Sequence, residues 1–223
     1  MANHETYSQD GQDRFVAETV FKAMRNGFFV EAGAGDGLWI SNTLLLERRY
    51  GWNGILVEPT SAFALLQRNR PSCWLDNSCL AGVPKTVTLV EIVDTGQASI
   101  SPAARDNLLL SRTVDKAPAK LTQMDSYWGR ARKQYEKLAR PLADVLKAHG
   151  APQCIDYLSL DVEGYEYEIL RTFPFAEYRF GCLGIERPPQ ALIEHLSVNG
   201  YGAIGRVGQD TFFRPYRASG EGT

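Results

Sequence analysis

Short apolar stretches alternate with helix-like stretches along most of this 223-residue chain, and this alternation restricts the fold more than any other feature. Residues 28–30, 55–57 and 155–160 form apolar runs of the length expected for buried strands. Residues 42–50 have helical character and end directly before Gly51, a common helix stop. Because neighbouring parallel strands are joined by helical crossovers, the pattern predicts an α/β fold with a doubly wound, mostly parallel sheet.

Further strand-like pieces complete a sheet of seven strands. Residues 73–75 and 180–185 are mostly apolar and are predicted to be strands of the same sheet. Residues 201–206 and 211–213 are two strand-like pieces on either side of turn-forming residues. The sequence therefore predicts a β-hairpin at the C-terminal end of the sheet. The β-branched segment 86–93 is expected to be an additional strand.

Two segments outside this pattern are predicted to be helical. Residues 1–27 are expected to form an N-terminal arm followed by an amphipathic helix. Trp128 and Tyr135 belong to an apolar stripe at helical spacing, which predicts that residues 125–150 are mostly helical, with Pro141 kinking or splitting the helix. A helical insert is accordingly expected over residues 115–141. No internal repeat or linker marks a second domain, so a single domain over residues 1–223 is expected.

Composition argues against several classes of partner. The chain has 24 lysine and arginine residues against 26 aspartate and glutamate residues, a net charge of −2, so it lacks the basic field that nucleic-acid binding requires. The four cysteines show no CxxC spacing, which argues against a zinc site. Because no apolar run approaches the roughly 20 residues of a membrane span, and no leader pattern opens the chain, we expect a cytoplasmic protein without membrane partners.

The sequence EAGAGDG at residues 31–37 directly follows the first predicted strand. Glycines at such a turn let the backbone pass close to a bound nucleoside. A dinucleotide would need the spacing GxGxxG, but Leu38 stands at the third glycine position, and Glu31 would repel a pyrophosphate. S-adenosylmethionine (SAM) instead presents an ammonium and a sulfonium, which a carboxylate attracts. We therefore expect SAM as the cofactor, with Glu31 binding its methionyl ammonium directly or through water.

Residues after the second and third strands are candidates for contacts to the nucleoside. Glu58, followed by Pro59, ends the second strand about 20 residues past the glycine turn, where nucleoside-binding folds place a carboxylate on the ribose hydroxyls. Asp76 and Asn77 follow the third strand and could hydrogen-bond the adenine. Both residue types also occur in ordinary turns, and that alternative stays open.

An acidic cluster is expected at the same edge of the sheet. Asp161 and Glu163 follow the fourth strand and Glu186 follows the fifth, so all three should lie where open parallel sheets bind ligands. Transfer of a methyl group to a hydroxyl requires a base close to the methyl, and these carboxylates are the candidate catalytic residues. Alternatively, Asp161 and Glu186 could hold Mg²⁺. Glu163 could instead be stabilised only by a helix N-terminus, and Glu186 by a loop ion pair.

Three blocks of the sequence together resemble the FkbM family of methyltransferases. They are GAGDGLWISN at residues 33–42, GWNGILVEP at residues 51–59 and IDYLSLDVEG at residues 155–164. The resemblance extends from residue 7 to about residue 213 and implies a class I methyltransferase sheet with SAM across the carboxyl ends of its strands. The residues it implies around SAM are Glu31, Gly33, Ala34, Gly35, Asp36, Glu58 and Asp161, with Gln9, Gln12 and Asn42 helping to close the site.

The resulting functional prediction is SAM-dependent transfer of a methyl group to a hydroxyl of a sugar or another small natural product. The alternatives are methylation of protein or lipid, a SAM-binding module without turnover, and an NAD-linked oxidoreductase. Methylation of nucleic-acid amines is disfavoured because DVEG at residues 161–164 replaces the Asn/Asp-Pro-Pro-Tyr stretch that such chemistry uses. The loop at residues 96–112 is a candidate lid over the acceptor, and His4 could fold over the site.

Overall fold

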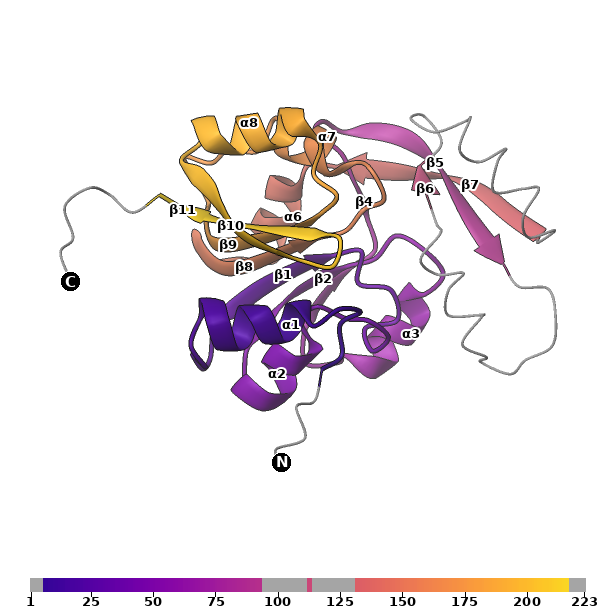
Figure 1. Cartoon of the computed structure of the whole chain (residues 1–223). Coiled ribbons are helices and arrows are strands. Elements are labelled where there is room, and N and C mark those ends of the chain that lie inside the picture. The colour runs from indigo at the N-terminus through magenta and orange to yellow at the C-terminus, as the bar shows by residue number, and fades with distance from the viewer. Residues whose placement is uncertain (1–5, 94–111, 114–130, 217–223) are drawn as a thin grey trace.

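The computed structural model describes residues 6–93, 112–113 and 131–216, and its centre is a seven-stranded sheet (Figure 1). The strand order is β10-β11-β9-β8-β1-β2-β3. The strands are β1 Phe28–Ala32, β2 Asn53–Val57, β3 Trp74–Asp76, β8 Cys154–Leu160, β9 Arg179–Glu186, β10 Tyr201–Val207 and β11 Asp210–Pro215. The prediction of an α/β fold with a seven-stranded, mostly parallel sheet is confirmed.

The strand β1 lies inside the sheet, between β2 and β8, and is parallel to both. Glu31 in β1 is paired with Ser159 of β8 on one side and with Leu56 of β2 on the other. The chain leaves β1 toward β2 and β3 and later returns on its other side as β8 and β9. Open α/β sheets bind ligands at such a switch point, outside the carboxyl ends of the strands. The strands β10 and β11 are antiparallel at the other end of the sheet.

Helices cover both faces of this sheet (Figure 1). One face carries α1 Gln12–Arg14, which continues as the π-helical segment η1 Phe15–Val20, with α2 Leu44–Tyr50 and α3 Phe63–Asn69. The other face carries α6 Leu142–Ala148, α7 Glu166–Leu170 and α8 Gln190–Val198. Because side chains alternate along a strand, Phe29 packs into the first layer and Val30 into the second. Each face therefore has its own hydrophobic core.

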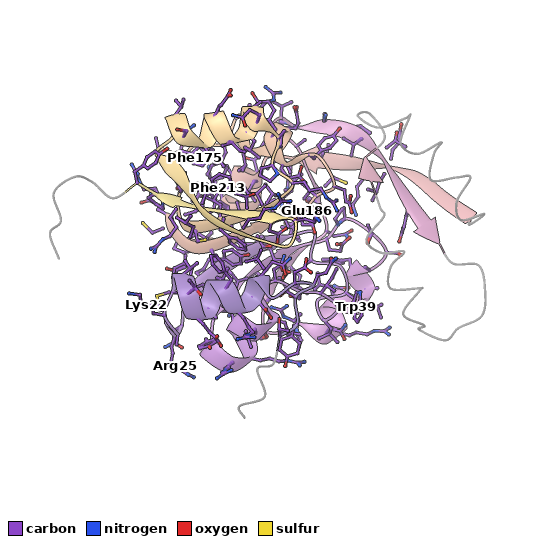
Figure 2. All side chains as sticks on the ribbon, in the orientation of Figure 1. Lys22, Arg25, Trp39, Phe175, Glu186 and Phe213 are labelled. Atoms are coloured by element: carbon purple, nitrogen blue, oxygen red, sulfur yellow. The ribbon has the colours of Figure 1, made fainter. Side chains whose placement is uncertain are left out.

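In both helical layers, apolar side chains face the hydrophobic core and most charged side chains face the solvent. Phe175 and Phe213 belong to the core beneath α8 (Figure 2). Lys22 and Arg25, just after η1, point outward into solvent. All four cysteines are free thiols. Within the described residues, the structure contains no helix with the length and apolar character needed to cross a membrane.

A second, four-stranded sheet has the order β4-β7-β5-β6. Its strands are β4 Cys79–Leu80, β5 Lys85–Val93, β6 Arg112–Thr113 and β7 Ala131–Arg140. The prediction of a strand at residues 86–93 is confirmed by β5. The prediction of a helical insert is wrong for residues 131–140, which form β7, paired antiparallel with β5 from Lys85↔Ala139 to Val93↔Ala131. This long ladder of backbone hydrogen bonds overrides the helical spacing of the apolar residues.

Pro141 separates β7 from α6, so the predicted break occurs at this residue, but between a strand and a helix. Proline lacks a backbone N–H and is tolerated at the start of a helix, where no intrahelical acceptor is needed. The predicted lid at residues 96–112 lies outside the described residues except for Arg112. His4 and Trp128 also lie outside them.

Candidate functional site

The glycine turn after β1 brings three strand ends together. The N–H of Gly33 donates to the carbonyl of Val57 over 3.0 Å, and the N–H of Gly35 donates to Oε2 of Glu58 over 2.7 Å. Gly33 has a φ of +89°, and a Cβ at this position would overlap the carbonyl oxygen of Asp161. Glycine is therefore required at residue 33 both by the backbone conformation and by the close approach of β8.

The turn forms one wall of an open pocket with about 880 Å³ of empty space, part of it open to solvent. Pockets that bind small ligands have volumes of roughly 300–1,000 Å³. The predicted site residues that line it are Gly33, Gly35, Asp36, Glu58, Pro59, Asp161 and Glu163. The structure thus places side chains that follow β1, β2 and β8 around one cavity, as parallel strands with aligned carboxyl ends require.

A smaller pocket adjoins the first and is more enclosed. It contains Glu31, Ala34, Asn42 and Ser159 in its wall. The two pockets have Ala32, Gly33, Gly35, Trp39 and Asp161 in common. These shared residues form the waist between the pockets. A ligand that filled both pockets would pass between the glycine turn and Asp161.

Glu31 is buried beneath the smaller pocket, with 3% of its surface exposed. Its carboxylate accepts hydrogen bonds from the backbone N–H of Asn42 over 2.7 Å and from the hydroxyls of Ser41 and Thr43 over 3.0 and 2.5 Å. Burial raises the pKa of Glu31, while the positive charge of Arg70 and these hydrogen bonds act in the opposite direction. Glu31 thus fixes the loop that follows the glycine turn, and its contact with a cofactor stays a prediction.

Glu58 is buried at the end of β2, and both of its carboxylate oxygens are held by the backbone. Oε2 accepts from Gly35, and Oε1 accepts from the N–H of Thr60 over 2.8 Å. Burial raises the pKa of Glu58 despite these hydrogen bonds. The carboxylate therefore has a fixed direction in the wall of the larger pocket, and oxygens fixed in this way can accept from ligand hydroxyls.

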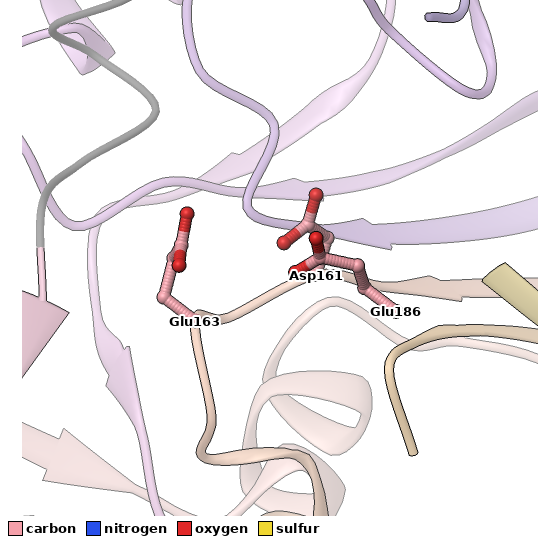
Figure 3. Close-up of side chains that lie close together, drawn as sticks. All are labelled: Asp161, Glu163 and Glu186. Carbon is pink, nitrogen blue, oxygen red and sulfur yellow. The ribbon is translucent and has the colours of Figure 1, made fainter. Parts of the chain in front are cut away.

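The three predicted catalytic carboxylates meet at the ends of β8 and β9 (Figure 3). One carboxylate oxygen from each of Asp161, Glu163 and Glu186 lies within 4.8 Å of the other two. Burial raises the pKa of Asp161 well above its ordinary value, and the charge of Glu186 and a hydrogen bond with it add to this effect. Carboxylate oxygens are also the ligands that Mg²⁺ prefers, so this donor set fits a hard cation.

Asp210 is a further acidic residue beside this cluster that the sequence did not single out. It is the first residue of β11 and is paired with Glu186 of β9. Burial and the negative charge of Glu186 raise its pKa to about 6, against a hydrogen bond from Gln12. The predicted residue Gln12 thus lies next to the acidic cluster through Asp210. The sequence indicated Asp210 only as a residue of a predicted hairpin turn. Its position beside Glu186 could not be predicted, because the pairing of β11 with β9 is a long-range feature.

Glu166 was also missed, and it holds the turn that carries the catalytic candidates. Its Oε1 accepts from the backbone N–H of Val162 over 3.2 Å and of Gly164 over 3.0 Å. Glu163, between these two residues, has a φ of +59°, an unfavourable backbone conformation for a residue with a side chain. Such conformations cluster at functional sites when the surrounding structure enforces them. The sequence signal that could have indicated Glu166 was its position as an acidic residue in the first turn of a helix.

Asp76 and Asn77 do not line either of these two pockets. Asp76 is paired with Arg140 of β7 and, over 2.9 Å, with His149. Burial alone would raise the pKa of Asp76, but hydrogen bonds from Ser78 and His149 and the charge of Arg140 lower it. The side-chain amide of Asn77 donates to the carbonyl of Glu58 over 2.8 Å. Asp76 therefore joins the second sheet to the main sheet, and its Oδ1 accepts from the N–H of Ser78 over 2.9 Å, as the turn alternative expects. A contact of either residue with adenine stays a prediction.

The residues after β3 that do line the larger pocket are Ser78 and, from strands β4 and β5 of the second sheet, Cys79, Leu80 and Leu89. Gln9 is exposed and lines neither of these pockets. Trp39, in the loop after the glycine turn, lines both, and 37% of its surface is exposed. It lies at the edge of the molecule below the sheet in Figure 2. The second sheet thus contributes to the wall of the candidate site.

Comparison with known proteins identifies the family of the chain. The family model described as the methyltransferase FkbM domain matches residues 31–199. The matched segment contains the glycine turn, Glu58 and the acidic cluster at the ends of β8 and β9. No curated protein matches the chain.

Proposed function

The chain belongs to the FkbM family of methyltransferases, and on this premise we propose that it transfers the methyl group of SAM to a hydroxyl of a sugar or another small natural product. The observation that carries the proposal is the position of Asp161 at the waist between the two pockets, with Glu163 and Glu186 beside it. A methyl donor that filled both pockets would present its reactive centre to these carboxylates.

The two pockets differ in a way that suits the two halves of SAM. In this proposal the larger pocket accepts the adenosine, where Glu58 accepts hydrogen bonds from the ribose hydroxyls and Leu80 and Leu89 supply apolar contacts to the adenine. The smaller pocket accepts the methionyl end, near Glu31 and Asn42. Negative charge on this side favours the ammonium and disfavours a pyrophosphate.

SAM supplies a methyl group that is already activated by the adjacent sulfonium. The chain's residues then have two tasks, which are to align the acceptor oxygen with this methyl and to accept the hydroxyl proton. As the new oxygen–carbon bond forms and the carbon–sulfur bond breaks, the electron pair goes to sulfur and the proton goes to a carboxylate of the cluster. Asp161 lies nearest the donor in this scheme, and Glu163 and Glu186 orient the acceptor.

The same carboxylates provide an alternative that involves a metal. Asp161 and Glu186, with Glu163 close by, could hold Mg²⁺, which would lower the pKa of a coordinated hydroxyl and fix its direction. The acceptor would then be oriented by the ion, and the proton would leave more easily. Both variants of the proposal assign the same residues to the acceptor side of the site.

Binding measurements test the cofactor first. We expect calorimetry to show association with SAM and with its demethylated product, and no heat with NAD. Glu58→Gln, which replaces an acceptor oxygen with an amide, should weaken SAM binding roughly tenfold or more, because a buried hydrogen bond to a charged group is worth about 1.5–3 kcal/mol. Glu177→Gln, at an exposed position that lines neither pocket, is the matched control and should bind like the wild type.

A transfer assay tests the acceptor. Methyl-labelled SAM is incubated with the protein and with deoxysugars, sugar nucleotides and hydroxylated natural products, and the label is followed by mass spectrometry. We expect label on a hydroxyl oxygen of one of these compounds. Label on a peptide or lipid alone would overturn the acceptor class, and tight NAD binding without SAM binding would overturn the cofactor. If the effect of the wild-type protein in cells is also produced by the variants Asp161→Ala, Glu163→Ala and Glu186→Ala, the chain is a SAM-binding module without turnover.

A further inference from the structure

Arg70 is a buried cation that no motif of the site includes. It follows α3, and 1% of its surface is exposed. A buried charge is costly unless hydrogen bonds and an opposite charge compensate it. The surroundings of Arg70 therefore show what the structure uses this charge for.

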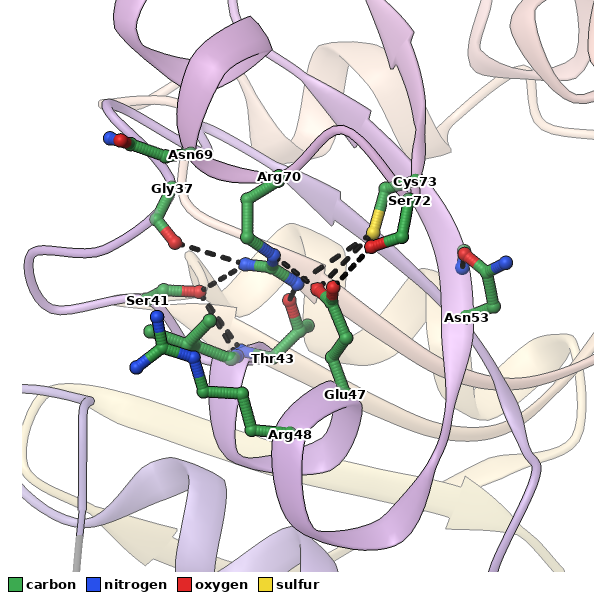
Figure 4. Close-up of polar contacts among 12 residues, drawn as sticks. Gly37, Ser41, Thr43, Glu47, Arg48, Asn53, Asn69, Arg70, Ser72 and Cys73 are labelled. Atoms are coloured by element: carbon green, nitrogen blue, oxygen red, sulfur yellow. Dashed lines mark hydrogen bonds and ion pairs between the residues drawn. The ribbon is translucent and has the colours of Figure 1, made fainter.

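The guanidinium of Arg70 contacts three residues of the loop after the glycine turn (Figure 4). Its Nη1 donates to the carbonyl of Gly37 over 3.1 Å and to Oγ of Ser41 over 3.2 Å. Its Nη2 donates to Oγ1 of Thr43 over 3.2 Å. Only the planar fork of an arginine can reach several acceptors in such different directions at once.

The opposite side of the guanidinium is held by Glu47 of α2, which is hydrogen-bonded and ion-paired to Nε. Glu47 also accepts from the hydroxyl of Ser72, and the ring of Phe29 lies 5.7 Å from the guanidinium carbon. The ion pair with Glu47 compensates the charge and fixes the rotamer of Arg70. The guanidinium that contacts the loop is thus held in one orientation.

Ser41 and Thr43 lie between this cation and the buried anion Glu31. Each of the two hydroxyls donates to the carboxylate of Glu31 and accepts from the guanidinium of Arg70. The attraction between the two charges is thus transmitted through two hydroxyls of the loop. Asn42, between them in the sequence, donates its backbone N–H to Glu31 and its amide to Ser159 over 3.0 Å.

We propose that Arg70 is a positioning residue for the cofactor, which together with Glu31 holds residues 37–43 in the shape that forms the smaller pocket. Four consecutive residues of this loop, from Trp39 to Asn42, line that pocket, so a loop that moved would open it. The inference rests on the proposed function, because the pocket is assigned to the methionyl end of SAM. It also gives Glu31 a second role, which is to hold residues 37–43 in place in addition to contacting the cofactor.

Two substitutions test the role of Arg70, one in Arg70 itself and one in its hydrogen-bond acceptor Thr43. Arg70→Lys keeps the charge but cannot reach Gly37, Ser41, Thr43 and Glu47 together. Thr43→Val keeps the shape of the side chain and removes only the hydroxyl between the charges. Each should raise the dissociation constant of SAM, and the KM for SAM, roughly tenfold or more, because small displacements of positioning groups have large effects on binding and rate. Thr43→Ser restores the hydroxyl and should bind SAM like the wild type.

A matched control separates positioning from general stability. Leu196→Ala removes a fully buried side chain of α8, on the face of the sheet opposite Arg70, and should lower Tm while leaving SAM affinity unchanged. If Arg70→Lys does not fold, Thr43→Val and Thr43→Ser decide the question. Wild-type affinity in Thr43→Val, or a loss of affinity in Leu196→Ala as large as in the loop variants, would overturn the inference. A wild-type protein that does not bind SAM would instead overturn the proposed function.

Discussion

A carboxylate oxygen of Asp161 and one of Glu186 lie within 4.8 Å of each other, just at the ends of the adjacent strands β8 and β9 (Figure 3). Burial and the negative charge of Glu186 raise the pKa of Asp161 well above its ordinary value, so the folded protein favours the protonated form of Asp161. A cation placed beside Asp161 would favour its ionised form. Binding of a sulfonium would therefore prepare Asp161 to accept the proton of an acceptor hydroxyl.

The first prediction concerns this pair. Asp161→Asn and Glu186→Gln should each lower kcat for methyl transfer roughly 100-fold or more, because general base catalysis commonly contributes factors of this size. Single-turnover rates measure the chemical step directly. For Glu186→Gln the affinity for SAM should change little, because Glu186 lines neither of the two pockets. A normal single-turnover rate in both variants would remove the pair from the mechanism.

Asp210 gives a prediction on stability and pH. Its pKa is raised from an ordinary 3.8 to about 6, so the folded protein favours the protonated form. The stability associated with that form is fully present below about pH 4 and is lost as the pH rises to about 6. Asp210→Asn, which stays neutral, should therefore be more stable than the wild type at pH 7–8 and have a higher Tm. The expected gain in the free energy of unfolding is on the order of 1–3 kcal/mol.

The difference in Tm between Asp210→Asn and the wild type should shrink as the pH falls from 6 to 4. Thermal unfolding followed by circular dichroism at a series of pH values measures it. Asp144→Asn, at an exposed position of α6, serves as the control and should show no such trend. A constant difference at all pH values would show that the carboxyl group of Asp210 is not the cause.

Gly33 and Gly200 form a matched pair for the third prediction. Both have a positive φ, at +89° and +88°, but a Cβ at residue 33 would overlap the backbone of Asp161, whereas a Cβ at residue 200 meets nothing within 4 Å. Gly200→Ala should therefore cost about 1–2 kcal/mol of stability from the backbone alone. Gly33→Ala should cost clearly more and should also abolish SAM binding. Urea unfolding and calorimetry measure the two effects, and equal losses in the two variants would contradict the structure.

The fourth prediction separates the proton-accepting and metal-binding uses of the carboxylates. Because the proposed mechanism passes the hydroxyl proton to a carboxylate of the cluster without a metal, we expect methyl transfer to continue at the same rate after treatment with EDTA. The measurement is the initial rate before and after chelation, followed by addition of Mg²⁺. A rate that falls with EDTA and returns with Mg²⁺ would assign the cluster to the metal instead.

The sequence predicted the parts of this protein that depend on local pattern. The short apolar runs correctly predicted β1, β2 and β8, because a strand buried on both faces needs continuous apolar residues. The glycine turn predicted a pocket beside β1, since positive φ values and close backbone approach require glycine there. Parallel strands align their carboxyl ends, which is why Glu58, Asp161 and Glu186 were expected at one edge of the sheet.

Only the tertiary structure decided how distant segments pair and which groups meet. Residues 131–140 have helical spacing, yet β5, at least 38 positions earlier at every pair, offers them a ladder of backbone hydrogen bonds. Arg70 and Asp210 carry no motif, and they matter because α3 packs beside the loop after the glycine turn and β11 pairs with β9. Sequence periodicity reflects forces within a few turns or strands, whereas buried charges find their partners only after the whole chain has packed.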